Sequence, residues 1–343
     1  MVGIDIGTYS IKVVEISSRG KNKKLENYGE VKSSLVYQEP LTDKNSGEML
    51  SNELLPQAIR EILDEAKIKT KSVTFSIPDF FTFCTSFEIP PMEEEEIPEA
   101  IHYNASQYIT LPIAEVTLDW QIIPNSSDNK NSPSKVFLVA VPNQTVEEYK
   151  EVARNAGLEV YALESEVLGL RRALVKNSNK KTICLIDVGV QSSTINIVDE
   201  GFLKRSYSFN FNSNQAPRPA PPALGVDQKK PEEVKNNEGV VSVKNGIPEQ
   251  VKLLVNPLLD EVKSISAEFF HSNQREVEEV YLTGGVATIP GLADYFTESL
   301  KKNVLVPNCF SEFLYPPILG QTLEKMSPSF SVAVGVALGG IET

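Results

Sequence analysis

The sequence is poor in the residues that build zinc centres, disulfide frameworks and membrane spans. Its 343 residues include three cysteines and two histidines, and none of them follows the spacing of zinc ligands. No window reaches the roughly 18 consecutive apolar residues that a membrane helix needs. The start, MVGIDIG, lacks the basic region of a signal peptide. We therefore expect a chain without structural disulfides, in a reducing compartment, with no membrane insertion of its own.

Positive charge is also scarce. Lys and Arg number 33 against 46 Asp and Glu, which leaves a net charge of −13. Nucleic-acid-binding proteins carry a basic surface that neutralises phosphates, so this composition argues against a nucleic-acid partner. It also disfavours direct adsorption to an anionic membrane.

Two common nucleotide motifs and the usual nucleophile triads are missing. There is no GxxxxGK[ST] loop and no GxGxxG after a strand, which disfavours P-loop hydrolysis and Rossmann dinucleotide chemistry. With two histidines and no nucleophile elbow, the sequence offers no basis for a Ser/His/Asp or Cys/His triad.

What is present is an alternation of strand and helix patterns, typical of an α/β protein, that repeats weakly in two halves. A strand–turn–strand pattern at 3–16 is matched at 183–198, and each copy places an Asp-x-Gly sequence at its turn. The turn residues are Asp5 and Gly7 in the first copy and Asp187 and Gly189 in the second. At roughly 150 residues per domain the length fits two domains. Two similar halves predict a cleft between them.

The paired turns suit phosphate groups together with a metal ion. A tight hairpin with glycine and hydroxyl residues points backbone N–H and side-chain O–H groups into a concave nest for anions. A carboxylate in such a nest would repel phosphate unless it holds a hydrated Mg²⁺ that bridges to the phosphates. Lys12 can supply a further positive charge. One Asp-x-Gly is usually a plain turn, but two of them followed by the turn Thr283-Gly284-Gly285 are more specific.

Three stretches resemble the nucleotide loops of the actin–hexokinase–chaperone ATPase superfamily. They are GIDIGTYSIKVVE for the first phosphate loop, LIDVGVQSSTINIV for the second and VYLTGGVATIPGL for the adenosine loop. The stretch FEIPPMEEEEIPEAIHYNASQYITLPIAEVTLDWQII is similar to the inserted subdomain of the PilM family of type IV pilus assembly proteins. The resemblance covers nearly the whole chain. It implies an α/β, actin-like fold with two related halves around a nucleotide cleft and an inserted FtsA-type subdomain.

The resemblance also implies domain boundaries. We expect the first half at 1–79 and 134–181, the inserted partner-binding subdomain at 80–133 and the second half at 182–343. Within the second half, residues 210–247 are rich in Pro, Asn, Lys and Glu and are expected to form a mobile insertion.

In the inserted subdomain, the glutamates at 93–96 are expected to open a helix whose dipole they complement. Ile97, Ile101, Ala105 and Tyr108 recur at helical spacing, and most of them should pack within the subdomain. About fifty residues have little core of their own, so we expect the subdomain to lean on the main body and leave a groove. An extended peptide could enter such a groove.

Carried over residue by residue, the resemblance implies which residues bind Mg-ATP. The first phosphate loop comprises Asp5, Gly7, Thr8, Tyr9 and Lys12, and the second comprises Asp187, Gly189, Gln191, Ser192 and Ser193. Asp5 and Asp187 hold Mg²⁺ through water. Gly284 and Gly285 pack against adenine and ribose, and Glu232 and Lys235 are the remnant of a helix that contacts the nucleoside.

Glu166 takes the place of the carboxylate that positions Mg²⁺ and the attacking water, which makes it the catalytic candidate. Glu164 lies two residues away and could be confused with it. Gln191 stands where the family usually has a small residue, and a Pro-rich insertion replaces the expected segment after Phe209. These departures predict at most a slow ATPase.

The resemblance implies a cytoplasmic ATP-binding scaffold of the type IV pilus assembly machine. The expected partners are the N-terminal cytoplasmic tail of PilN, a single-pass inner-membrane protein, and other inner-membrane components of the machine. PilN would hold the chain at the inner face of the cytoplasmic membrane.

Two alternatives stay open. One is a small-molecule kinase, although no separate Asp for an acceptor hydroxyl is found. The other is an FtsA-like division filament, whose C-terminal amphipathic membrane helix does not follow the buried-looking end SVAVGVALGGIET. Self-association of the chain also stays open.

Overall fold

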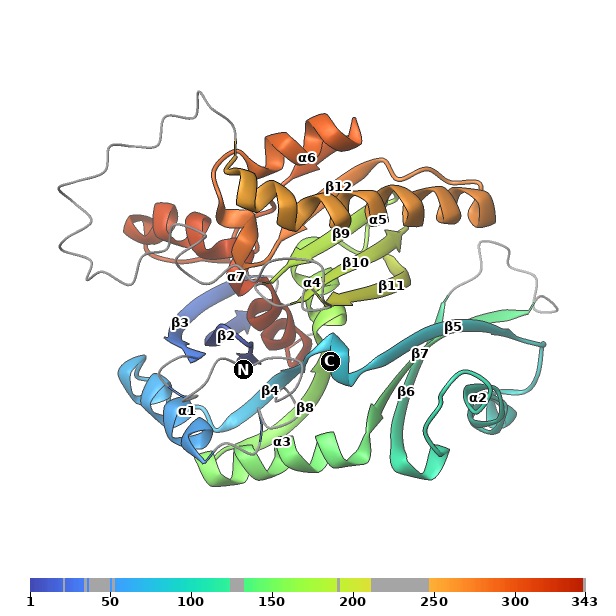
Figure 1. Cartoon of the computed structure of the whole chain (residues 1–343). Helices are drawn as coiled ribbons and strands as arrows, with labels where there is room; N and C mark the ends of the chain where they lie inside the picture. Colours follow the sequence, from blue (N-terminus) through green and yellow to red (C-terminus); the bar gives the residue numbers. More distant parts are fainter. Residues whose placement is uncertain are drawn as a thin grey trace.

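The computed structural model describes residues 1–20, 22–33, 36, 50, 53–123, 133–189, 192–210 and 247–341. Within these residues the strands form three sheets, of six, five and three strands. In Figure 1 the six-stranded sheet lies below the five-stranded sheet, and the small sheet forms a lobe at the lower right.

The six-stranded sheet has the order β14-β3-β2-β1-β4-β8. Its strands are β1 (Val2–Ile6), β2 (Ser10–Arg19), β3 (Asn22–Lys32), β4 (Ser72–Ile77), β8 (Glu159–Ser165) and β14 (Phe313–Leu314). One face packs on α1 (Leu54–Glu65) and α3 (Asn143–Ala156), and the other packs on α7 (Gly320–Gly339). All five residues of β1 are buried, as expected for a strand that is covered on both faces.

The five-stranded sheet has the order β11-β10-β9-β12-β13. Its strands are β9 (Thr182–Val188), β10 (Ser192–Asp199), β11 (Phe202–Asn210), β12 (Glu279–Thr283) and β13 (Asn303–Leu305). α5 (Glu249–Asn273) and α6 (Leu292–Leu300) cover one face. The other face turns toward α4 (Glu166–Leu174) and α7, where Leu170, Leu185 and Val332 share one buried cluster.

The repeat predicted from the sequence is confirmed. β1 and β2 form an antiparallel hairpin, and β1 pairs in parallel with β4. β9 and β10 form the equivalent hairpin, and β9 pairs in parallel with β12. The two Asp-x-Gly turns therefore lie at equivalent ends of two similar sheets.

The three-stranded sheet consists of β5 (Phe83–Ile89), β7 (Ser134–Pro142) and β6 (Val116–Ile123), with β7 in the middle. α2 (Ile97–Ala105) covers one face of it, and Glu93 and Glu96 form a capping box ahead of the helix. We call β5, α2, β6 and β7 the insert. The structure moves the expected boundary at residue 133 to Pro142, because β7 pairs with β5 on one side and with β6 on the other.

The uncovered face of the insert packs on both halves of the molecule. Phe137 of β7 lies in one buried cluster with Val167 of α4 and Leu203 of β11. The hydroxyl of Ser86 in β5 donates a hydrogen bond of 3.2 Å to the carbonyl of Lys204 in β11. The insert thus leans on the main body through both halves.

Two elements differ from the sequence pattern. The pattern predicts a last helix from Ser329, whereas α7 begins at Gly320 and runs through Pro328. β11 was not expected, because its charged and polar residues hide the strand alternation. Among the residues described above, no helix is long and apolar enough to cross a membrane.

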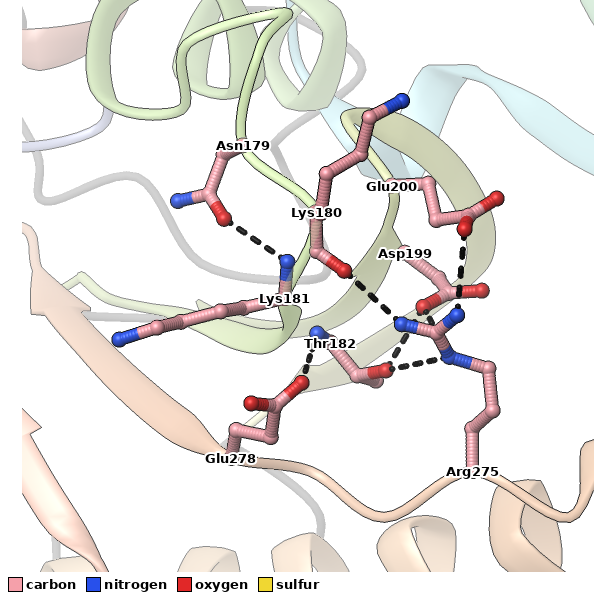
Figure 2. Close-up of polar contacts among 8 residues, drawn as sticks. All are labelled: Asn179, Lys180, Lys181, Thr182, Asp199, Glu200, Arg275 and Glu278. Atoms are coloured by element: carbon pink, nitrogen blue, oxygen red, sulfur yellow. Dashed lines mark hydrogen bonds and ion pairs between the residues drawn. The ribbon is translucent and has the colours of Figure 1, made fainter.

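Arg275 holds together the end of the five-stranded sheet that lies opposite the turn carrying Asp187 and Gly189 (Figure 2). The Arg275 guanidinium forms an ion pair of 2.9 Å with Asp199 and donates hydrogen bonds to Thr182 Oγ1 at 3.3 Å and to the Lys180 carbonyl at 2.9 Å. Thr182 in turn donates to Asp199 at 2.7 Å. These bonds hold the start of β9, and β9 carries Asp187 to the opposite end of the sheet.

Candidate functional site

A cavity of about 350 Å³ lies where the turns of the two halves face each other. Twelve residues predicted from the sequence line it: Asp5, Gly7, Thr8, Tyr9, Lys12, Glu166, Asp187, Gly189, Ser192, Ser193, Gly284 and Gly285. Gln191, Glu232 and Lys235 lie outside the described residues, as does nearly all of the insertion expected at 210–247. The structure therefore brings every described site residue to one cavity.

The two Asp-x-Gly turns close in the same way. The Gly7 N–H donates to the Ser10 carbonyl at 3.1 Å, and the Gly189 N–H donates to the Ser192 carbonyl at 3.0 Å. A Cβ on Gly7 would lie 3.0 Å from the Ser10 carbonyl oxygen, and one on Gly189 would lie 2.7 Å from that of Ser192. A Cβ would therefore clash with the closing carbonyl at position 189 and would crowd it at position 7.

The third turn packs directly on the second. Gly284 has φ +92°, and a Cβ on it would overlap Oδ1 of Asp187 and the carbonyl of Val188. Its N–H donates to the Pro328 carbonyl at 3.0 Å, and the Thr283 hydroxyl donates to the same oxygen at 2.8 Å. The start of the Gly-Gly turn is thus locked between β9 and α7.

Asp5 and Lys12 form a buried pair in the first turn. They are paired across β1 and β2, with 3.8 Å between Lys12 Nζ and Asp5 Oδ2. The Ser76 hydroxyl donates to the other Asp5 oxygen at 2.8 Å. Burial raises the pKa of Asp5, while Lys12 and Ser76 oppose the rise.

Two further carboxylates of the cavity, those of Asp187 and Glu166, have less compensation. Burial, followed by repulsion from Asp5 and Asp79, raises the pKa of Asp187 to about 7. Burial, followed by repulsion from Asp5, Asp79 and Asp187, raises the pKa of Glu166 well above its ordinary value. Of the described residues that line the cavity, Lys12 is the only basic one, so the site has an excess of negative charge. The part of the chain that the structure describes has no group of three or more His, Cys, Asp or Glu side chains that could hold a metal directly.

The structure separates the two glutamates that the sequence leaves close together. Glu164 forms a bidentate ion pair with Arg172, which also donates to the Gly335 carbonyl at 3.0 Å. Glu166, the first residue of α4, lines the cavity instead. Glu164 is therefore a structural residue, and Glu166 is the site residue.

Several cavity residues were not predicted. Ser10 lines the cavity, and its hydroxyl is buried without a hydrogen-bond partner among the described residues, as is that of Ser193. Aligning the two turns would have found it, because Ser10 and Ser192 follow the glycines at the same spacing. Glu30 and Thr194 also line the cavity, but their places depend on the strand register, which the turns alone do not reveal.

Two related halves, each with a phosphate-type turn at a shared cavity, define an actin-like α/β protein. The chain belongs to the family of type IV pilus assembly protein PilM, whose model matches residues 3–341. The resemblance seen in the sequence is thereby confirmed.

Solved structures agree on the fold. The chain is similar to a protein in a PilM-PilN type IV pilus biogenesis complex, with a TM-score of 0.79, 23% identity, and coverage of 100% of this chain and 98% of that one. It is also similar to the ethanolamine utilization protein EutJ from Carboxydothermus hydrogenoformans, with a TM-score of 0.50, 16% identity, and coverage of 98% and 88%. At these identities the similarity bears on the fold. Neither the family nor these structures support the kinase or the division filament.

Proposed function

We propose that this chain binds Mg-ATP between its halves and serves as a scaffold of the type IV pilus machine, docked on the cytoplasmic tail of a PilN protein at the inner face of the cytoplasmic membrane. Family membership supports the pilus role. The similarity to a protein of a PilM-PilN complex supports the partner. The observation that carries the nucleotide site is the pair of Asp-x-Gly turns that line one cavity.

The residues of the cavity fit the phosphates of a nucleotide. The buried hydroxyls of Ser10 and Ser193 have no hydrogen-bond partner in the part of the chain that the structure describes, and such groups are usually satisfied by a ligand or by water. Asp5 and Asp187 would hold Mg²⁺ through water, and the ion would offset the excess negative charge and bridge to the phosphates. Lys12 would add a point charge.

The remaining residues suit the nucleoside and the attacking water. Gly284 and Gly285 line the cavity without side chains of their own, and adenosine would pack against them. Glu166 would orient a water molecule and the hydrated ion from the start of α4. Hydrolysis is expected to be slow at most, since phosphoryl transfer depends on close positioning and Gln191 departs from the family pattern.

The junction of the insert with both halves offers a place for an apolar side chain of the tail. A second cavity, of about 190 Å³, lies between β6, β7, α4 and β11. Its apolar walls include Phe137, Leu168 and Leu203, and Gln121 of β6 stands at its exposed side. Extended peptides bind through backbone hydrogen bonds and through pockets that take alternate side chains.

A binding assay with the PilN tail tests the scaffold role. Gln121→Arg places a long charged side chain at this second cavity and should weaken tail binding at least about tenfold. Thr117→Arg changes an exposed residue on the same face of β6, away from that cavity, and serves as the control. In cells, deletion of the tail should release the chain from the membrane fraction. A chain that stays membrane-associated without the tail contradicts the proposal.

A further inference from the structure

A buried aspartate stands outside every site predicted from the sequence. Asp79 follows β4 and opens the short turn Asp79–Phe81, from which the chain enters β5 of the insert. It is 7% exposed. Its neighbours Pro78 and Phe80 line the cavity between the halves, whereas Asp79 itself is not among the lining residues.

The carboxylate of Asp79 fastens the start of α4. The Ser165 hydroxyl donates to Asp79 Oδ1 at 3.1 Å. Burial raises the pKa of the same carboxyl, and the Val167 N–H, in the first turn of α4, opposes that rise. Asp79 Oδ2 is buried without a hydrogen-bond partner among the described residues, so the start of α4 is what holds this side chain. The first N–H groups of a helix lack partners within the helix. Ser165, at the cap position, makes no capping bond with its own side chain, and its hydroxyl donates instead to Asp79, which comes from a distant segment.

The backbone of Asp79 reaches the side chain of Glu166. Its N–H donates to Glu166 Oε2 at 3.4 Å, a long hydrogen bond. The two contacts are reciprocal, as in a capping box: one residue gives an acceptor to the helix and a donor to a helix carboxylate. Here the two partners come from segments that are far apart in the sequence.

We propose that Asp79 is a positioning residue that fixes the first turn of α4 with its carboxylate and orients the Glu166 carboxylate toward the cavity with its N–H. The proposal rests on the proposed Mg-ATP site. Asp79 would not touch the nucleotide, and its effect would pass through Glu166. If Asp79 were only a helix cap, its removal would lower the stability of the fold, and any effect on Mg²⁺-dependent ATP binding would be the same whether or not Glu166 is present.

The test is a double-mutant cycle on the intact chain. For each variant, calorimetry measures the factor by which Mg²⁺ raises the affinity for ATP. Asp79→Ala and Glu166→Gln should each lower this factor at least about fivefold, and the double variant should match Glu166→Gln within about twofold. Asp79→Asn keeps an oxygen acceptor and should restore the factor to within about twofold of wild type. Thr82→Ala, which removes a 3.3 Å hydrogen bond to the Asp79 carbonyl and none to α4, should leave it unchanged.

A loss from Asp79→Ala that is equal in both backgrounds, or no loss at all, overturns the proposal. A wild-type chain that shows no Mg²⁺-dependent ATP binding overturns the proposed function instead. Urea unfolding of the wild type, the two single variants and the double variant then reports whether the Asp79 carboxylate and Glu166 are coupled. Asp79→Ala keeps the N–H that donates to Glu166, so any coupling passes through the start of α4. Additive effects of the two substitutions contradict the coupling, and non-additive effects support it.

Discussion

The first and second Asp-x-Gly turns close with the same hydrogen bond but differ in charge. In strand register, Lys12 stands opposite Asp5 in the first turn, whereas Thr194 stands opposite Asp187 in the second. Asp5 also accepts a hydrogen bond from Ser76. As a result burial raises the pKa of Asp187 to about 7, while Lys12 and Ser76 oppose the rise at Asp5.

The difference indicates a division of roles between two similar halves. The first half carries its own cation, while the second half presents a half-buried carboxylate that needs positive charge from elsewhere. A hydrated divalent ion between the turns would meet that need and would make phosphate binding possible at the same time. The repeat preserves the backbone of the turn and varies the residue that sets its charge.

The largest effect on stability is expected from disrupting the packing of the Gly284-Gly285 turn on the turn that carries Asp187. Gly284→Ala would drive a Cβ into Asp187 and Val188 at a positive φ, so the free energy of unfolding should fall by about 2–4 kcal/mol. Gly285→Ala is the matched control, because its Cβ would meet no atom within 4 Å. Urea unfolding measures both. Equal losses from the two variants would contradict the packing of the third turn on the second.

The pH dependence of stability tests whether burial raises the pKa of Asp187 more than that of Asp5. The pKa of Asp187 is about 7 in the folded chain, against an ordinary value near 4. Between these values the folded chain keeps a proton that the unfolded chain has lost, so the free energy of unfolding should fall as the pH rises, by about 3 kcal/mol from this group across the range. Asp187→Asn should flatten the profile more than Asp5→Asn, since Lys12 compensates Asp5. Urea unfolding of the ligand-free chain across this range measures the profile, and equal flattening would contradict the assigned difference.

A smaller effect is expected from giving the second turn the charge of the first. Thr194→Lys places an ammonium group opposite Asp187, as Lys12 stands opposite Asp5. ATP affinity without Mg²⁺ should then rise about fivefold, or about 1 kcal/mol. Thr194→Met controls for side-chain length without charge. If the two variants bind ATP equally, the charge opposite Asp187 is not what makes the site depend on a divalent ion.

Much of the cavity could be predicted from the sequence because its parts are local. Each turn needs a glycine at a fixed distance from an Asp, and the two turns repeat, so Asp5, Gly7, Asp187 and Gly189 follow from the motif itself. The family resemblance adds Glu166 and the other lining residues of the two loops. What escaped prediction depends on contacts between distant segments. Asp79 matters only because it meets the start of α4, and β7 joins the insert through pairing on both of its edges. Pro328 suggested a helix start, yet α7 continues through it.

Calorimetric titration of ATP into the intact chain, with and without Mg²⁺, tests most directly whether the two turns hold one nucleotide between them. Wild type should bind ATP tightly only when Mg²⁺ is present. Asp187→Ala should weaken Mg-ATP binding at least about tenfold, or about 1.4 kcal/mol, because the carboxylate that holds the hydrated ion is gone. Asp294→Ala, on the surface helix α6, should leave the affinity unchanged. Equal affinity of wild type and Asp187→Ala for Mg-ATP would contradict the assignment.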